Sequence, residues 1–400
     1  MKRVYLCFCL AVIALFLGWL PKLNADRVAW FLDNDFAHFY LTGKLVRSGV
    51  NPYGVALSSL YSEEGFTPSR DIPFAGTPPA LAGVLAPFTI LGPKESFVLW
   101  TAVQVVSLML GALMVSRLAG LKRSALYTGA VLLGAVAPLG MFAHIRYGQA
   151  QALIFFLVVL GLGLMEREGG WSRRLGLVVW GFSAGLKLFT LPLVFVAWRY
   201  RGRVGVGWFA LGFALPLLAL AMWCGVSSLT TFVTATIPYI RDLSLEFNGN
   251  ISLSGALTYS QRILFGEEVV SARVEQFASL LLFLPLVIFE RREKRDLIAA
   301  TLLFLTASCL LSPTSWPHYL PLLTGGFIYI LSRAEDAARP TPALWVTLGL
   351  YVSMGAALGF IGRGDALTRL VSAWWGPMCM AIMGLLVTLA RRRSWLFATS

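Results

Sequence analysis

Long apolar runs alternate with short polar connections along most of the chain. About 20 apolar residues cross the roughly 30 Å hydrocarbon core of a bilayer as a helix. The pattern predicts such helices near residues 95–117, 124–143, 150–165, 205–225, 275–290, 296–311, 318–331, 342–361 and 372–390. An apolar N-terminal segment without a small-residue cleavage site adds a retained first helix. With the segment 175–198 discussed below, we expect about twelve transmembrane helices.

Two long stretches, 21–94 and 226–273, are too polar to cross a membrane. In the first, Phe36 to Ser48 has a helical pattern that Gly49 should close. A second helix, Ala80 to Leu91, is too short to span and is expected to lie at the membrane surface. If it spanned, the basic cluster around Arg117 would move outside, against the positive-inside rule. We therefore predict a first external loop with interfacial helices, and a second external loop at 226–273.

Composition agrees with a membrane protein. The 400 residues are 57% hydrophobic and 13% charged, with a mean hydropathy of +0.72. Soluble domains have about 25% charged residues, so a soluble globule is excluded. The net charge of +13 comes from Lys and Arg clusters between apolar runs, as in cytoplasmic loops, and does not indicate nucleic-acid binding. We expect residues 1–400 to form a single integral domain, multi-pass in the cell inner (plasma) membrane.

One charged residue lies inside an apolar segment. Between Arg174 and Arg199 the chain leaves a basic side and returns to one within about two dozen residues, which favours a hairpin with Lys187 near its turn. A single long span stays open as an alternative. A lysine at this depth is costly and indicates a functional site, unless it only extends to the interface.

The predicted outer face collects most of the candidate chemistry. It holds all three histidines of the chain, and its charged and polar side chains are Asp33, Asp35, His38, Arg70, Asp71, His144, Arg146, Gln149, Lys187, Arg241, Asp242, Glu246, Asn250 and His318. Cations and carboxylates together suit an anionic lipid with a polar head group. Asp33 or Asp35 could instead be a helix N-cap, and His144 an interfacial histidine bonded to backbone. No nucleotide, redox or metalloprotease motif occurs, which argues against those three classes of protein, and no cofactor is expected.

Several motifs, taken in order, resemble one enzyme family. They are DFAHFY from Asp35 with the downstream GVNPY, the PPAL element at Pro78, GQAQALI after Arg146, GFSAGLKLFTLPL around Lys187, and WPHY at Trp316 to Tyr319. The chain is similar to the GT-C glycosyltransferases that use polyprenyl-phosphate sugars, and especially to glycosyltransferase family 87, the polyprenyl-phosphomannose-dependent alpha-mannosyltransferases. One departure is Gly76-Thr77 before the two prolines, where that family usually has an aromatic residue.

The resemblance implies a GT-C helical bundle that moves a sugar, expected to be mannose, to a glycolipid or glycan acceptor without a metal ion. Asp35 would be the catalytic base, with inversion at the sugar, and the active site would face the periplasm or cell exterior. Lys187, His318 and Arg146 would bind the donor phosphate. Candidate substrate contacts are Asp33, His38, Tyr40, Gln149 and Asn250. A lipid or solute transporter and a lipid-linked glycan polymerase or ligase are the alternatives.

Overall fold

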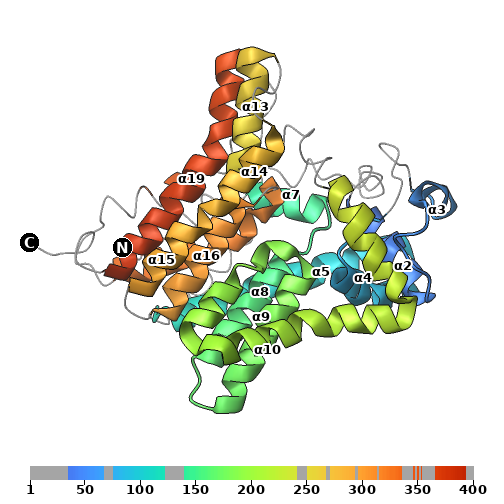
Figure 1. Cartoon of the computed structure of the whole chain (residues 1–400), viewed down its shortest axis with the longest axis horizontal. Helices are drawn as coiled ribbons and strands as arrows, with labels where there is room; N and C mark the ends of the chain where they lie inside the picture. The colour runs from blue at the N-terminus through green and yellow to red at the C-terminus, as the bar shows by residue number, and fades with distance from the viewer. Residues whose placement is uncertain are drawn as a thin grey trace, which may run out of the picture.

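The computed structural model describes residues 35–66, 75–121, 139–240, 250–266, 271–292, 296–312, 315–335, 346, 349–350, 353 and 365–392. All regular secondary structure in these residues is helical, as predicted (Figure 1). Asp33 and the predicted spans near 124–143 and 342–361 lie wholly or mostly outside the described residues, as do the N-terminal helix and the residues Arg70, Asp71, Arg241, Asp242 and Glu246.

The segment predicted to be the first external loop folds into short helices beside the main bundle. They are α2 (Asp35–Arg47), α3 (Leu57–Glu63), α4 (Pro79–Leu85) and the 3-10 helix η3 (Ala86–Ile90). The sequence predicted α2 as Phe36 to Ser48, ended by Gly49. Gly49 has φ +71° and the bonds of a Schellman motif, Gly49 N–H to the Val46 carbonyl and Val50 N–H to the Leu45 carbonyl. The helix and its end are therefore confirmed to within one residue.

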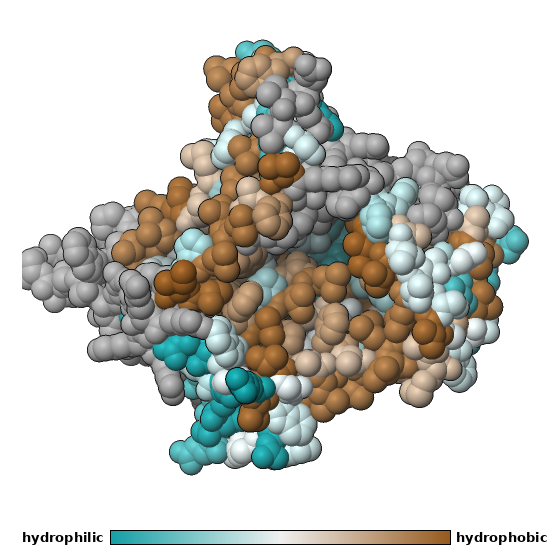
Figure 2. Space-filling model, in the orientation of Figure 1, coloured by the Kyte–Doolittle hydropathy of each residue, from teal (hydrophilic) through white to brown (hydrophobic). Residues whose placement is uncertain are grey.

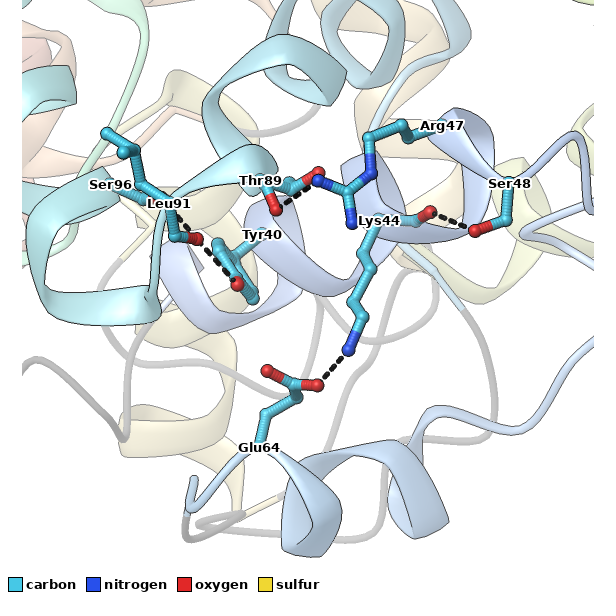
Figure 3. A network of polar contacts seen from close by, with 8 residues as sticks. All are labelled: Tyr40, Lys44, Arg47, Ser48, Glu64, Thr89, Leu91 and Ser96. Carbon is cyan, nitrogen blue, oxygen red and sulfur yellow. Dashed lines mark hydrogen bonds and ion pairs between the residues drawn. The ribbon is translucent and has the colours of Figure 1, made fainter.

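Polar contacts tie α2 to its neighbours (Figure 3). The Tyr40 hydroxyl donates to the Leu91 carbonyl at 3.0 Å, and Arg47 donates to the Thr89 carbonyl at 2.5 Å. Lys44 pairs with Glu64 just after α3. Two side chains of α2 thus donate to backbone carbonyls in and after η3, and a third pairs with a carboxylate after α3, which fixes the position of α2 against both.

Longer helices form the centre of the molecule. They are α5 (Pro93–Leu118), α8 (Gln151–Met165), α9 (Gly170–Leu186) and α10 (Leu193–Cys224), with a kink in α10 at Gly202 and the short η4 (Leu188–Thr190) before it. Gly161 of α8 faces Gly176 of α9 so closely that a Cβ on either would meet the other's carbonyl oxygen. Such small residues allow helix backbones in membranes to approach closely, which explains how α8 and α9 pack.

The remaining helices extend from this centre. They are α7 (Leu139–Arg146), α11 (Val226–Thr231), the π-helix η5 (Phe232–Thr236), α13 (Leu253–Phe265), α14 (Ala272–Leu281), α15 (Phe283–Arg292), α16 (Leu297–Leu311), η6 (Pro317–Leu323), α17 (Thr324–Glu335) and α19 (Ala366–Arg392). In Figure 1, α13 and one end of α19 project together from the body of the molecule. Trp374 of α19 donates to Ser260 of α13 at 2.9 Å, which joins the two.

Three of the described helices are long and apolar enough to cross a membrane: 93–118, 193–224 and 366–391. Large apolar side chains of α10, including Val204, Leu215 and Met222, are exposed, and hydrophobic colour covers most of the surface displayed outside the grey atoms (Figure 2). Apolar surface of this extent is expected of a protein that faces lipid. The shorter apolar helices α8 and α16 match predicted spans, while the count of about twelve stays a prediction.

Candidate functional site

Three side chains from distant parts of the sequence meet at the start of α2. The Gln149 amide donates through Nε2 to Oδ2 of Asp35. The Lys187 ammonium donates to Oε1 of the same amide at 2.6 Å. Asp35 also lies near enough to Lys187 for their charges to interact. The structure thus brings together the predicted base, a predicted phosphate ligand and a predicted substrate contact.

The end of α7 positions Gln149. Gly148 has φ +60°, and the backbone forms a Schellman motif in which Gln149 N–H donates to the His144 carbonyl at 3.1 Å and Gly148 N–H to the Ile145 carbonyl at 2.9 Å. The indole of Trp100 in α5 donates to the Gly148 carbonyl at 2.7 Å. Gln149 is only 3% exposed. The turn therefore holds the amide in one place beside α2.

Lys187 lies at the break between α9 and α10. Its backbone is extended, with φ −153° and ψ 125°, and it separates the last turn of α9 from η4. This break agrees with the hairpin that charge at both ends of the segment predicted. The ammonium also lies 5.2 Å from the centre of the Tyr319 ring, a cation–π contact. An aromatic ring and an amide oxygen thus hold the charge in a half-buried position.

The WPHY element forms an aromatic wall next to Lys187. The His318 ring is stacked with Trp316 and lies 5.9 Å from the ring of Tyr147 and 5.2 Å from that of Tyr319. Tyr319 in turn contacts Phe189 of η4 at 5.1 Å. His318 is 5% exposed and lies within electrostatic reach of Lys187. The structure therefore places this predicted phosphate ligand near the lysine.

His144 lies deeper than the sequence suggested. Its ring is fully buried, with the Gln151 side chain and the His318 backbone nearby. Proximity to the His318 backbone agrees with a histidine bonded to backbone, while full burial does not agree with an exposed position at an interface. The ring belongs to a polar cluster that includes Lys187, whose charge lies within electrostatic reach.

The other predicted site residues lie around this centre or bind backbone groups elsewhere in the fold. His38 packs its ring against Tyr61 of α3 at 5.7 Å. Tyr40 uses its hydroxyl within the fold, as described above. The Arg146 guanidinium lies over the Tyr147 ring at 5.6 Å, one turn before Gln149. Asn250 is buried, and its side-chain oxygen accepts from the backbone N–H groups of Ser252 and Ser315 at 3.1 and 2.9 Å. Substrate contact by these residues remains a prediction.

Sequence reasoning did not anticipate two features of the centre. Gln149 was a candidate substrate contact, whereas its amide links Asp35 and Lys187. Tyr319 was part of a motif without a role of its own, whereas its ring lies under the lysine. Gly148, which ends α7, is the one local feature of the sequence that indicates a fixed position for Gln149. The contacts of Gln149 and Tyr319 join residues that lie too far apart in the sequence to be inferred from motif spacing.

The centre combines a half-buried carboxylate and ammonium with buried imidazoles in one cluster. A carboxylate can accept a proton from a hydroxyl, and cations can stabilise negative charge that develops on an oxygen. Among the described residues no group of three or more His, Cys, Asp or Glu side chains could hold a metal ion. Independence of metal and cofactor stays a prediction.

A helical membrane protein with a carboxylate and cations at one centre has the groups that a transferase needs. The model of glycosyltransferase family 87 matches residues 77–313, more than half of the chain. The protein therefore belongs to glycosyltransferase family 87 and is a membrane glycosyltransferase. Comparison with curated proteins and with solved structures gives no match. The matched region contains Gln149 and Lys187, while Asp35 and His318 lie outside it.

Proposed function

We propose that the protein transfers a mannose residue from a polyprenyl-phosphate donor to a glycolipid or glycan acceptor on the non-cytoplasmic face of the cell membrane, with inversion. The contact of Asp35 and Lys187 with one amide carries the proposal, because it sets a base beside a cation. Family membership supports glycosyl transfer over solute transport.

In the proposed reaction the acceptor hydroxyl loses its proton to Asp35. Its oxygen forms a bond to the anomeric carbon as the bond from that carbon to the phosphate oxygen breaks. The electron pair leaves with the polyprenyl phosphate, whose charge Lys187, His318 and Arg146 stabilise. Attack opposite the phosphate inverts the anomeric centre, so a beta-linked donor gives an alpha-linked product. This direct displacement needs no cofactor.

The direct test is incubation of the purified protein with polyprenyl-phosphomannose and a panel of glycolipid acceptors, followed by mass analysis. A product heavier than its acceptor by one hexose supports the proposal. Polyprenyl-phosphoglucose and a polyprenyl-diphosphate oligosaccharide are the control donors. Transfer from the oligosaccharide donor alone would replace the proposal with a lipid-linked glycan polymerase or ligase, and transfer from none would refute it.

A further inference from the structure

The Gln149 amide stands between two opposite charges and satisfies both. An ammonium group only donates hydrogen bonds and an ionised carboxylate only accepts them, whereas an amide does one at each end. Its Nε2 donates to Asp35 while its Oε1 accepts from Lys187 at 2.6 Å. If the amide were reversed, its NH₂ group would face the Lys187 ammonium, donor against donor. Its oxygen would then face the Asp35 carboxylate, acceptor against acceptor. Chemistry therefore fixes which end of the amide meets each charge.

The protein holds this amide firmly. Its backbone is bound into the end of α7, and Gln151 Nε2 lies 3.4 Å from its side-chain oxygen. The Gly148 backbone before it packs against Phe36, the residue after Asp35. Gln149 is buried, contacts Gln151 and follows a residue packed on Phe36, so its side chain cannot easily rotate away from Asp35 or Lys187. Gln149 is therefore a rigid part of the centre.

A neutral spacer has a consequence that an ion pair would not have. A carboxylate in direct contact with a cation loses basicity, typically by about 1–3 pKa units. A lysine so paired also has fewer N–H donors for a phosphate. The amide donates one hydrogen bond to the carboxylate and accepts one from the ammonium, but it adds no charge of its own. The carboxylate therefore stays more basic than it would be in a direct ion pair, and the ammonium keeps its remaining N–H donors for a phosphate.

We propose that Gln149 is a positioning residue for the sugar transfer proposed above: its amide keeps Asp35 and Lys187 apart, leaving the carboxylate basic and the ammonium available to the donor phosphate. The inference rests on the proposed function for its purpose. Its physical content, the separation of the two charges, is measurable without any substrate.

The test is a titration of the Asp35 carboxyl in the purified full-length protein by infrared difference spectroscopy, with the band identified by its loss in Asp35→Asn. In Gln149→Met the carboxylate loses a hydrogen bond, which raises its pKa, but the ammonium loses its acceptor and moves into direct contact with the carboxylate. Because a full charge outweighs one neutral hydrogen bond, the Asp35 pKa falls overall, by about one unit. In Gln149→Glu a second carboxylate faces Asp35 and binds Lys187, which raises the Asp35 pKa by a similar amount. The two variants thus shift the titration in opposite directions.

The variants leave the other titratable residues near α2 unchanged, so these residues are the same in every titration. His38 lies on the same helix against Tyr61, and His144 and His318 lie on the Lys187 side. At the far end of α2 are Lys44, Arg47, Glu64 and Glu95. The double variant Gln149→Met with Lys187→Met isolates the lysine, because without the ammonium the Gln149→Met change should no longer lower the Asp35 pKa.

Gln104→Met is the matched control, since it removes another buried glutamine, whose oxygen accepts from Leu153 N–H, without touching either charge. It should lower stability and leave the Asp35 titration unmoved. Unchanged titrations in both Gln149 variants, or shifts in the same direction, would overturn the inference. Mannose transfer by the wild-type protein is assayed in parallel and decides the proposed function separately, whatever the titrations show.

Discussion

The backbone of Gly148 packs directly on the side chain of Phe36. A Cβ at position 148 would lie 2.5 Å from Phe36 Cβ, well inside any normal contact. Gln149 and Asp35 are the adjacent residues on the two segments, so this close approach is what lets the amide reach the carboxylate. A side chain at position 148 would therefore disturb the centre although the position is not itself polar.

Gly148→Ala should therefore disrupt the centre through packing. A left-handed backbone costs a residue with a Cβ about 1–2 kcal/mol, and the overlap with Phe36 adds about 1–3 kcal/mol. We expect a lower melting temperature and a loss of transfer activity, measured by thermal unfolding and product formation in detergent.

Gly120→Ala separates the two causes. Gly120 also has a positive φ, +78°, at the end of a helix, but a Cβ there meets nothing within 4 Å. It should show the backbone cost alone, with transfer activity kept. Equal losses of activity in both variants would show that the contact with Phe36 is not important for the centre.

Local features of the sequence predicted much of the fold. The glycine that ends α2 and the apolar lengths of α5 and α16 are properties of short segments, since helix caps and hydropathy need no distant partner. Basic clusters at both ends of a short apolar segment likewise placed Lys187 at a turn.

The contacts within the centre could not be predicted in this way. Asp35 meets Gln149 from 114 positions away, and nothing in the spacing of motifs specifies that pair. Tyr40 and Asn250 are both candidate substrate contacts in the sequence, yet their polar groups bind backbone groups in the fold. A motif shows that a residue matters without showing whether it contacts substrate or holds the structure.

Lys187→Ala and His318→Ala should weaken use of the lipid-phosphate donor. Each removes a hydrogen-bond donor near the phosphate charge, and charge-assisted bonds are about twice as strong as neutral ones. We expect a higher donor KM, a lower kcat or both, measured by initial rates over a range of donor concentrations. Lys94→Ala removes the same charge from an exposed position and serves as the control. Wild-type kinetics in both site variants would exclude these residues from the donor site.

Membrane topology gives a prediction independent of catalysis. The segments Gly49 to Pro79 and Ser228 to Ala272 should lie outside, and Glu166 to Arg173 and Arg291 to Arg295 inside, because Lys and Arg clusters stay in the cytoplasm. Single cysteines in a cysteine-free background, labelled in intact cells with a membrane-impermeant thiol reagent, should react only in the first two segments. Protection there, with labelling in the other two, would reverse the orientation.

Asp35→Asn should abolish sugar transfer while expression and donor binding stay close to wild type. A general base contributes about 10²-fold to 10⁴-fold in rate, and an amide cannot accept the proton. If Asp35 served only to cap α2, asparagine would replace it well, since both residues are favoured caps, and most activity would remain. Asp33→Asn is the matched control and should retain measurable transfer. Product formation and donor binding by the two variants distinguish the outcomes: loss in Asp33→Asn alone would move the base to Asp33, and full activity in both would refute a carboxylate base at this position in the chain.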